Sequence, residues 1–310
     1  MLTIASLVYI WRIHHLPSYL GVGVVCEHVY TPVSENADLR LMSFDVRALE
    51  CAYEITMVFS DSSIKVNLSI QFARLYANRI KLYRYTPAQP SALQTIAGGI
   101  YLTSCITQCV FLSSVKVLTV GTDGYAIVWP LMSESDEEPT STLGWEHPTR
   151  IHQNSSKAMA AYQVVEDAML VVSGGDDGSL AFLLASTETP SLTVQDHMVY
   201  TCPPIVVSRA HSSAVTACAV VVHGARSFIL TCGNDEWIRL WEVKILVLHG
   251  KLKPSNASGG KHEMEICRLK KVKTSVADVS SMAVLATSEE SARVLLCGVG
   301  MEVIRLDWEI

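Results

Sequence analysis

Three side chains in the second half of the chain, His211, Thr231 and Asp235, have the types found in nucleophilic triads. In a triad the imidazole takes the proton of the hydroxyl and the carboxylate orients the imidazole. Geometry defines a triad, and composition alone does not. Two Ser-x-x-Lys pairs, at 62–65 and 113–116, match a motif that works on a helix in β-lactamase-like enzymes, but both lie in strand-like sequence. We therefore expect no catalytic residue.

Cofactor and metal motifs are also missing from the sequence. No Gly-x-Gly-x-x-Gly follows a strand and opens a helix, so no dinucleotide or S-adenosylmethionine loop is expected, and Gly174-Gly175 is interpreted as a pair of hairpin or loop glycines. Cys105 and Cys109 are the closest cysteine pair, and they lack a second pair of ligands with zinc spacing. The sequence predicts no cofactor and no metal.

The positions of these residues are explained by one unit, Ala210 to Val243. An apolar segment from Val215 to Val222 leads through a polar break to a second one, Phe228 to Leu230. An Asn-Asp-Glu corner at 234–236 comes next. In the segment after it, Ile238, Leu240 and Glu242 alternate with Trp237, Arg239 and Trp241. Alternation with a period of two on both sides of a polar corner predicts a β-hairpin.

The unit recurs, and it resembles the WD repeat of β-propellers. Aligned turns follow Asp61, Asp123, Asp177 and Asp235, and a decayed copy without a turn Asp spans 294–304. In that family a His, a Ser or Thr, the turn Asp and a Trp form a hydrogen-bonded structural chain. The resemblance assigns these roles to His211, Thr231, Asp235 and Trp241, to His152, Ser173 and Asp177, and to Thr119, Asp123 and Trp129. Leu183 replaces the Trp of the third copy.

We accordingly expect an all-β fold, a single WD-repeat β-propeller region over 1–310. About five blades are recognisable, at 22–85, 92–131, 151–185, 207–243 and 275–309, and seven is the usual number in the family, so the region is expected to be part of a larger propeller. The turns lie about 54 to 65 residues apart, against roughly 40 to 45 in a standard repeat. The excess is assigned to loop insertions at 133–148, 186–204 and 250–273.

Composition places the chain among globular proteins of a reducing compartment. Of the 310 residues 49% are apolar and 17% charged, and the nine cysteines show no Cys-x-x-Cys spacing. The apolar opening, Met1 to Trp11, lacks a basic start and a cleavage site, and it is interpreted as a strand and not as a signal segment. We expect a cytoplasmic protein with no membrane contact.

One family of WD-repeat proteins is more similar than the others. The order of an Asp-Leu-Arg-Leu-Met-Ser segment (38–43), Leu-Thr-Val-Gly-Thr-Asp-Gly (118–124) and Arg-Ala-His-Ser-Ser-Ala-Val-Thr (209–216) resembles the C-terminal region of the WD-repeat protein six family, as does the ending, Gly300-Met301-Glu302-Val303 with Trp308. The resemblance implies a non-catalytic scaffold that binds a tRNA 2′-O-ribose methyltransferase and positions tRNA for methylation of the wobble nucleotide. The alternative is a general adaptor for protein–protein interaction in a signalling, trafficking or ubiquitin-ligase complex.

Charge leaves the role of RNA open. The formal net charge is −6, the wrong sign for a protein that binds phosphates with its whole surface. Basic residues nevertheless gather in the last predicted insertion, and they form either a solvated loop or a contact with the tRNA backbone. The residues are Lys251, Lys253, Lys261, Arg268, Lys270, Lys271 and Lys273.

Overall fold

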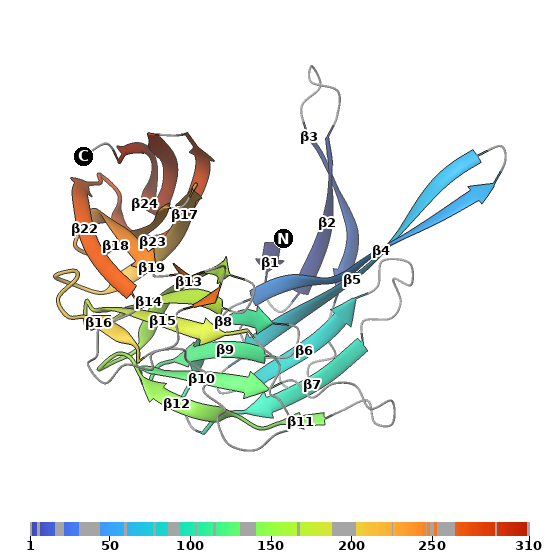
Figure 1. The fold of residues 1–310 in the computed structure, drawn as a ribbon, viewed down its shortest axis with the longest axis horizontal. Coiled ribbons are helices and arrows are strands. Elements are labelled where there is room, and N and C mark those ends of the chain that lie inside the picture. The colour runs from blue at the N-terminus through green and yellow to red at the C-terminus, as the bar shows by residue number, and fades with distance from the viewer. Residues whose placement is uncertain are drawn as a thin grey trace. The chain divides into compact units, whose positions relative to one another are not determined.

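The structure is a computed structural model, and its described residues form strands and turns without a helix (Figure 1). It describes residues 2–4, 7–15, 22–30, 44–58, 61–76, 79–85, 94–102, 104–113, 116–130, 141–165, 168–187, 203–224, 226–245, 247–248, 251–252, 264–288 and 290–308. The expected all-β fold is confirmed. No helix long and apolar enough to span a membrane occurs over these ranges.

The chain divides into two compact units, and the first comprises residues 1–106 and 135–143. Its strands β1 (Leu2–Ile4), β2 (Leu7–His15) and β3 (Val22–Tyr30) form one sheet. A second sheet has the order β11-β7-β6-β5-β4, with β4 (Phe44–Val58), β5 (Asp61–Tyr76), β6 (Arg79–Tyr85), β7 (Gln94–Ile100) and β11 (Ser141–Leu143). The apolar opening of the chain is therefore strand, as expected.

The second unit comprises residues 107–134 and 144–310 and contains three four-stranded sheets. The first of them, sheet C, has the order β12-β10-β9-β8, with β8 (Ile106–Ser113), β9 (Lys116–Gly121), β10 (Tyr125–Pro130) and β12 (Glu146–Arg150). Sheet D consists of β13 (Ser156–Val165), β14 (Ala168–Gly175), β15 (Leu180–Ser186) and β16 (Ile205–Val207). Sheet E consists of β17 (Val215–His223), β18 (Arg226–Gly233), β19 (Trp237–Ile245) and β22 (Met264–Lys273).

The fourth strand of each of these sheets lies where the sequence analysis placed a loop or the next segment. Strand β22 occupies the end of the insertion expected at 250–273, β12 overlaps the one at 133–148, and β16 follows the one at 186–204. In the first unit, β7 pairs with β6 and so belongs to the sheet of the preceding predicted blade. The sequence had placed β7 in the next blade, at 92–131. The expectation of a continuous loop at 250–273 is wrong for 264–273, because a lysine-rich strand at a sheet edge lacks the apolar alternation of an inner strand. The pair β20 (Val247–Leu248) and β21 (Lys251–Leu252) precedes it.

Apolar layers join successive sheets of the second unit. One layer combines Leu118 and Val128 of sheet C with Val171 and Leu183 of sheet D. The next combines Phe182 of sheet D with residues of sheet E that include Ile229 and Trp241. Since the third-copy Leu183 lies fully buried in the first layer, its apolar side chain is used for packing between sheets.

The last sheet contains β23 (Ala277–Thr287) and β24 (Ser291–Asp307). The amide of Trp308 donates to the carbonyl of Glu290 at 2.9 Å, so the two ends of β24 meet and the chain reverses within it. Gly300, with φ 111°, lies in the middle of β24 and provides the reversal. One face of this hairpin packs on sheet E, where Trp308 stacks on Phe228 with ring centroids 5.0 Å apart.

Candidate functional site

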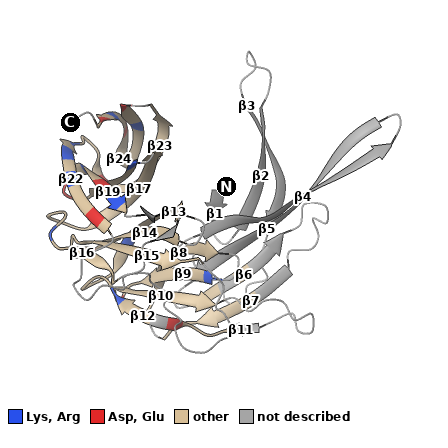
Figure 2. Cartoon of the chain, in the orientation of Figure 1, with Lys and Arg blue, Asp and Glu red and all other residues tan. Residues whose placement is uncertain are grey.

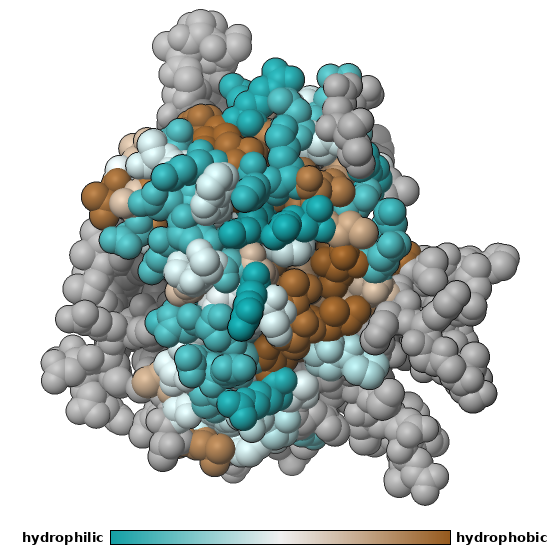
Figure 3. All heavy atoms as spheres, turned by 90° about the vertical axis from the view of Figure 1, so that its left-hand side faces the viewer, coloured by the Kyte–Doolittle hydropathy of each residue, from teal (hydrophilic) through white to brown (hydrophobic). Residues whose placement is uncertain are grey.

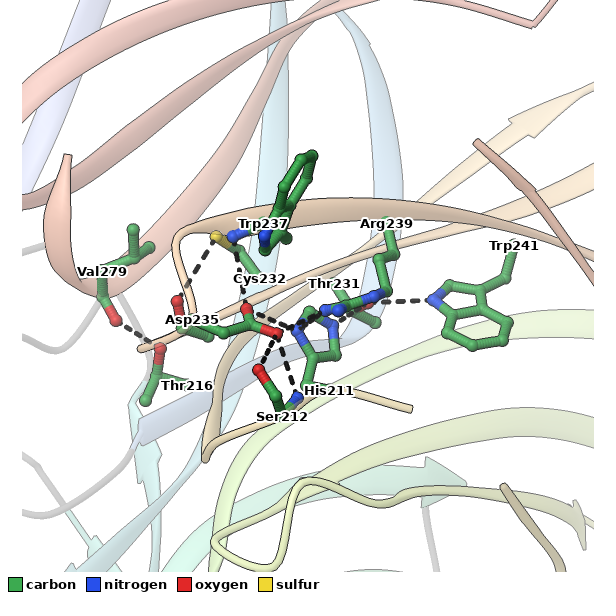
Figure 4. A network of polar contacts seen from close by, with 11 residues as sticks. His211, Ser212, Thr216, Thr231, Cys232, Asp235, Trp237, Arg239, Trp241 and Val279 are labelled. Atoms are coloured by element: carbon green, nitrogen blue, oxygen red, sulfur yellow. Dashed lines mark hydrogen bonds and ion pairs between the residues drawn. The ribbon is translucent and has the colours of Figure 1, made fainter. Parts of the chain in front are cut away.

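The turn of sheet E holds a hydrogen-bonded network (Figure 4). The indole Nε1 of Trp241 donates to Thr231 Oγ1 at 2.9 Å, and Thr231 Oγ1 lies 2.8 Å from His211 Nε2. Nδ1 of the same imidazole lies 3.0 Å from Asp235 Oδ1, and the Ser212 amide donates to Asp235 Oδ2 at 3.1 Å. The structure therefore connects the four residues assigned to this turn by one continuous series of hydrogen bonds.

The donors fix the protonation of the imidazole. An ionised carboxylate only accepts, so His211 Nδ1 carries the proton of the neutral imidazole and donates it to Asp235. Nε2 is then an acceptor, and it receives the proton of the Thr231 hydroxyl, which itself accepts from the Trp241 indole N–H. Burial lowers the pKa of His211 to about 4, although the hydrogen bond with Asp235 opposes this shift. The imidazole is neutral at pH 7.

Arg239 belongs to the same network, although its sequence position did not lead us to predict this. Its Nη1 donates to Asp235 Oδ2 at 2.8 Å, and the guanidinium also lies against His211 Nδ1. Since His211 Nδ1 carries a proton, the Asp235 carboxylate accepts hydrogen bonds from both the Arg239 guanidinium and the His211 imidazole. Burial alone would raise the pKa of Asp235, but hydrogen bonds from His211 and Arg239 outweigh it and lower that pKa. Sheets C and D hold Ile127 and Ala181 at the matching position.

In sheet D, the corresponding hydrogen bonds have different partners. His152 Nε2 lies 2.9 Å from Ser173 Oγ, while Nδ1 lies 2.7 Å from Ser179 Oγ and 3.6 Å from Asp177 Oδ1. Ser179 Oγ donates to Asp177 at 2.6 Å, so it must accept from His152 Nδ1. Ser156 Oγ, 2.5 Å from Ser173 Oγ, completes the chain where the Trp is missing. Burial lowers the pKa of His152 against the attraction of Asp177.

Sheet C retains one end of this pattern. Trp129 Nε1 donates to Thr119 Oγ1 at 2.9 Å, and Asp123 accepts the Tyr125 amide at 3.1 Å. The three residues assigned to this turn thus make two separate hydrogen bonds. Among the described residues, no hydrogen bond joins Thr119 to Asp123.

The last sheet carries an equivalent carboxylate contact that was not predicted from the sequence. Glu302 Oε2 accepts the Thr274 hydroxyl at 2.6 Å and the Ser275 amide at 2.8 Å. Asp177 accepts the Gln153 amide and Asp235 the Ser212 amide in the same way. The decayed copy therefore lacks a turn Asp but uses Glu302 in its place, with Thr274 in place of the histidine. The hydrogen bond from Thr274 lowers the pKa of Glu302.

Backbone bonds connect each turn to the segment that follows it. The Gly124 carbonyl accepts the His152 amide at 3.1 Å, the Gly178 carbonyl accepts the His211 amide at 2.9 Å, and the Glu236 carbonyl accepts the Thr274 amide at 2.9 Å. All three acceptors have positive φ, at 79°, 72° and 61°. This conformation suits glycine, and Glu236 therefore holds a strained backbone.

Replacing Glu236 by glycine is expected to raise the free energy of unfolding by about 0.5 to 1 kcal/mol: the left-handed conformation costs a residue with a Cβ roughly 1 to 2 kcal/mol, and the larger entropy of glycine in the unfolded chain offsets roughly 0.4 to 1 kcal/mol of the gain. The ion pair that is lost, Lys273 Nζ to Glu236 Oε2 at 3.6 Å, joins exposed groups and contributes little. Urea denaturation checks the value. Glu236→Ala removes the carboxylate and keeps the strain, so equal stability of the two variants would contradict this explanation.

Burial excludes these hydroxyls from attack on a substrate. Thr231 and Ser173 are 0% exposed, and His211 is 2% exposed. Their role is to fix the register of the strands through buried hydrogen bonds. Within the described ranges, no group of three or more His, Cys, Asp or Glu side chains is placed to hold a metal ion.

Glycines Gly174 and Gly175 lie at the end of β14, next to the turn of the β14–β15 hairpin, which agrees with their interpretation as hairpin or loop glycines. A Cβ on Gly175 would lie 2.4 Å from His152 Nδ1 and from Asp177 Oδ1. Glycine is required there because the network approaches the backbone closely.

The basic residues lie mainly on β22, the edge strand of sheet E (Figure 2). Arg268, Lys270, Lys271 and Lys273 are all exposed. Lys271 Nζ lies 4.7 Å from the centroid of the Trp237 ring, and Lys270 Nζ donates to the Asp307 carbonyl at 3.4 Å. Lys251 lies on β21, while Lys253 and Lys261 fall outside the described residues. Four of the seven candidate residues thus share one strand.

Comparisons with known proteins agree with this geometry. The family model described as WD domain, G-beta repeat matches residues 202–242, which contain the network of sheet E. A search of the curated proteins finds no match. Among solved structures, the chain is similar to a chain of the Chaetomium thermophilum Polycomb Repressive Complex 2 bound to GSK126, with a TM-score of 0.61 and 11% identity. The alignment covers 98% of this chain and 64% of that one, so this chain spans less than two thirds of its neighbour's length.

An identity of 11% shows a shared fold and nothing about partners. Antiparallel four-stranded sheets, the buried networks at their turns and the matched repeat at 202–242 all point to the same fold class. The chain is an all-β protein with the fold of WD-repeat β-propellers.

Proposed function

We propose that this chain is a non-catalytic scaffold that binds a tRNA 2′-O-ribose methyltransferase and positions tRNA for methylation of the wobble nucleotide. A WD repeat indicates a protein–protein interaction scaffold, and proteins that contain one are in general not catalytic. The order of motifs between Asp38 and Trp308 supports the choice of partner. The observation that carries the RNA contact is the group of exposed cations on β22.

Strand geometry makes β22 suitable for a phosphate backbone. Arg268, Lys271 and Lys273 lie opposite Trp241, Arg239 and Trp237 of β19, so their side chains follow one row of that strand. Residues two apart in a strand are separated by about 6.6 Å, close to the spacing of successive phosphates in an extended nucleic acid. The bulge between Leu240 and Trp241 adds Leu269 to β22 and keeps Arg268 in the row. The contact is local because the net charge of the chain is −6.

The scaffold would act by holding the enzyme and the tRNA in fixed positions. Binding enzyme and tRNA to one scaffold raises their effective concentration and fixes which nucleotide reaches the active site. The methyl transfer belongs to the partner.

A general protein–protein adaptor is the second candidate. The matched repeat, which ends at residue 242 and does not include β22, favours it, as does the neighbour's membership of a structure titled Polycomb Repressive Complex 2. In this case β22 is a solvated edge whose lysines prevent pairing with other chains.

Charge reversal on β22 tests the RNA contact. We expect the variant with Arg268, Lys271 and Lys273 replaced by Glu to retain the methyltransferase in co-purification and to lose tRNA. Single substitutions to Ala should each lower the slope of log K against log salt by about 1, as expected for one phosphate contact. The matched control is Lys157→Glu, an exposed lysine on β13.

The outcomes separate the two candidates. Unchanged tRNA binding in the triple variant would contradict the role of β22. If no ribose methyltransferase co-purifies with the wild-type chain, and wobble methylation is unchanged in cells that lack it, the adaptor function remains.

A further inference from the structure

Trp237, the first residue of β19, is used differently from three other tryptophans of the second unit. Trp129, Trp241 and Trp308 are 0%, 4% and 3% exposed, and each bonds or stacks inside the protein. Trp237 is partly exposed, and it does not belong to the apolar layers on either side of sheet E. Figure 4 shows its indole pointing away from the network of that sheet. The ring therefore serves neither the core nor the network.

The turn does not require an aromatic residue at this position. In sheets C, D and E, the residue two places after the turn Asp donates its backbone amide to the Asp carboxylate, and these residues are Tyr125, Ser179 and Trp237. Because the amide makes this bond, the type of side chain can vary, as the serine of sheet D shows. The indole of Trp237 is therefore available for a ligand.

Positive charges lie beside this indole. Lys271 Nζ is 4.7 Å from the centroid of the Trp237 ring, and Arg268 belongs to the same row of β22. Over the described ranges neither of these cations forms an ion pair, whereas Lys273 Nζ lies 3.6 Å from Glu236 Oε2. Hydrophilic residues cover much of the side of the molecule on which β22 lies (Figure 3). An aromatic ring and two uncompensated positive charges are thus accessible together.

We propose that the RNA bound at β22 is single-stranded, with one unpaired base stacked on the Trp237 indole and phosphates of the same strand bound by Arg268 and Lys271. Aromatic side chains beside a basic groove are the means by which proteins bind single-stranded nucleic acid. In a duplex the bases are stacked on one another, so a duplex would use the cations and leave the indole without a partner. The inference rests on the proposed function, because it specifies the kind of RNA that β22 binds.

Lys271 has to leave the ring before a base can stack on the same face. A cation–π contact between exposed groups favours the lysine position only about twofold to fivefold. Stacking of a base on an aromatic side chain strengthens binding by roughly fivefold to a hundredfold. Since Lys271 is exposed, its long side chain is free to turn from the ring to a phosphate. The base therefore displaces the ammonium group, and the charge is used again on the same strand.

The chain itself supplies the matched variants for a test with the full protein. The probes are an oligouridine of about eight nucleotides and an RNA duplex of the same length. Trp237→Ser introduces the residue of sheet D, and it should weaken oligouridine binding about fivefold to a hundredfold and leave duplex binding unchanged. Trp237→Tyr introduces the residue of sheet C, which keeps a ring, and should bind within about threefold of the wild type.

Salt dependence separates stacking from charge. Trp237→Ser should keep the slope of log K against log salt, because no phosphate contact is lost. Arg268→Ala should lower the magnitude of that slope by about 0.7, as expected for one phosphate of a single strand. Equal urea midpoints of wild type and Trp237→Ser show that the variant is folded. Trp237→Leu, which removes the ring but keeps an apolar side chain, replaces it if the midpoint falls.

Tryptophan fluorescence supplies the second measurement. Oligouridine should quench the emission of the wild type, and it should quench Trp237→Tyr much less although this variant still binds. Oligouridine binding that is unchanged in Trp237→Ser but weakened in Arg268→Ala overturns the inference and leaves the RNA contact of β22 in place, since phosphates alone are then recognised. Tighter binding of the duplex than of oligouridine by the wild type does the same. A wild-type chain that binds neither RNA overturns the inference together with the RNA contact of the proposed function.

Discussion

Asp235→Ala is expected to lower the free energy of unfolding by about 3 to 5 kcal/mol, the cost of removing one partner of a buried ion pair. Its side chain is 5% exposed and that of Arg239 is 10% exposed. Without the carboxylate, the guanidinium and His211 Nδ1–H lose the acceptor that they share. The amides of Ser212 and Trp237 lose their acceptor as well. Urea denaturation of the full chain measures the difference.

Two variants show whether the buried cation is the main cause. Asp177→Ala removes three hydrogen bonds from Ser179 and Gln153, but no arginine among the described residues bonds to Asp177, so a smaller loss of about 1 to 3 kcal/mol is expected. Adding Arg239→Ile to Asp235→Ala removes the unpaired charge and introduces the residue that sheet C holds at Ile127. The double variant should be more stable than Asp235→Ala alone. Additive losses would contradict the explanation by an unpaired charge.

The sequence predicted the network of sheet E because its signal is local. His211, Thr231, Asp235 and Trp241 lie within 31 residues, and their order alone identifies the repeat. Arg239 was missed, although its place four residues after the turn Asp, inside an alternating strand, puts it on the same face as Trp241. Whether that face is buried depends on the neighbouring sheet, which local sequence does not contain.

The networks of sheet D and the last sheet were predicted less well. Ser156 and Ser179 are common residues, and only the three-dimensional spacing shows that one replaces an indole and the other bridges His152 to Asp177. Glu302 was missed because the comparison required Asp. A longer carboxylate reaches the Ser275 amide when Thr274 replaces the larger histidine. A Thr or His at the start of the copy, paired with any acid near the turn, is the signal that would have found it.

Strand β22 shows a different limit. Its lysines made 264–273 look like a loop, because solvent on one side of an edge strand removes the need for apolar alternation. The bulge at Leu269 also interrupts the period of two, so Ile266 lies on the face of β22 that packs with Trp241, while Val272 lies on the opposite face and packs with Ile238.

Stability is expected to fall by roughly 3 kcal/mol between about pH 6.5 and about pH 4, owing to His211 alone. The folded protein keeps the His211 pKa at about 4, against 6.5 for an ordinary histidine. Within this window the unfolded chain binds a proton at this position and the folded protein does not. Proton binding then favours the unfolded state increasingly as the pH falls. Urea midpoints at a series of pH values, at constant m, measure the effect.

His152 and Asp235 extend the same trend. The pKa of His152 is also lowered, mainly by burial, so its protonation destabilises the folded state in the same direction. Asp235 has a pKa below its ordinary value of 3.8, and the stability that its ionised form contributes is lost at still lower pH. The loss of stability should therefore begin near pH 6.5 with the histidines and continue below pH 4 with the carboxylate.

Removing the imidazoles should remove the upper part of this dependence. His211→Gln is expected to be less stable than the wild type at pH 7, because glutamine cannot span from Thr231 to Asp235, but its stability should change less between pH 6.5 and pH 4. The remaining slope should decrease further when His152→Gln is added. Protonation of His211 places a second positive charge beside Arg239, with Asp235 as the acceptor of both. Wild-type stability that is constant or rises as the pH falls through this window would mean that both imidazoles are already charged in the folded protein, and the directed hydrogen-bond chain from Trp241 through Thr231 would then be wrong.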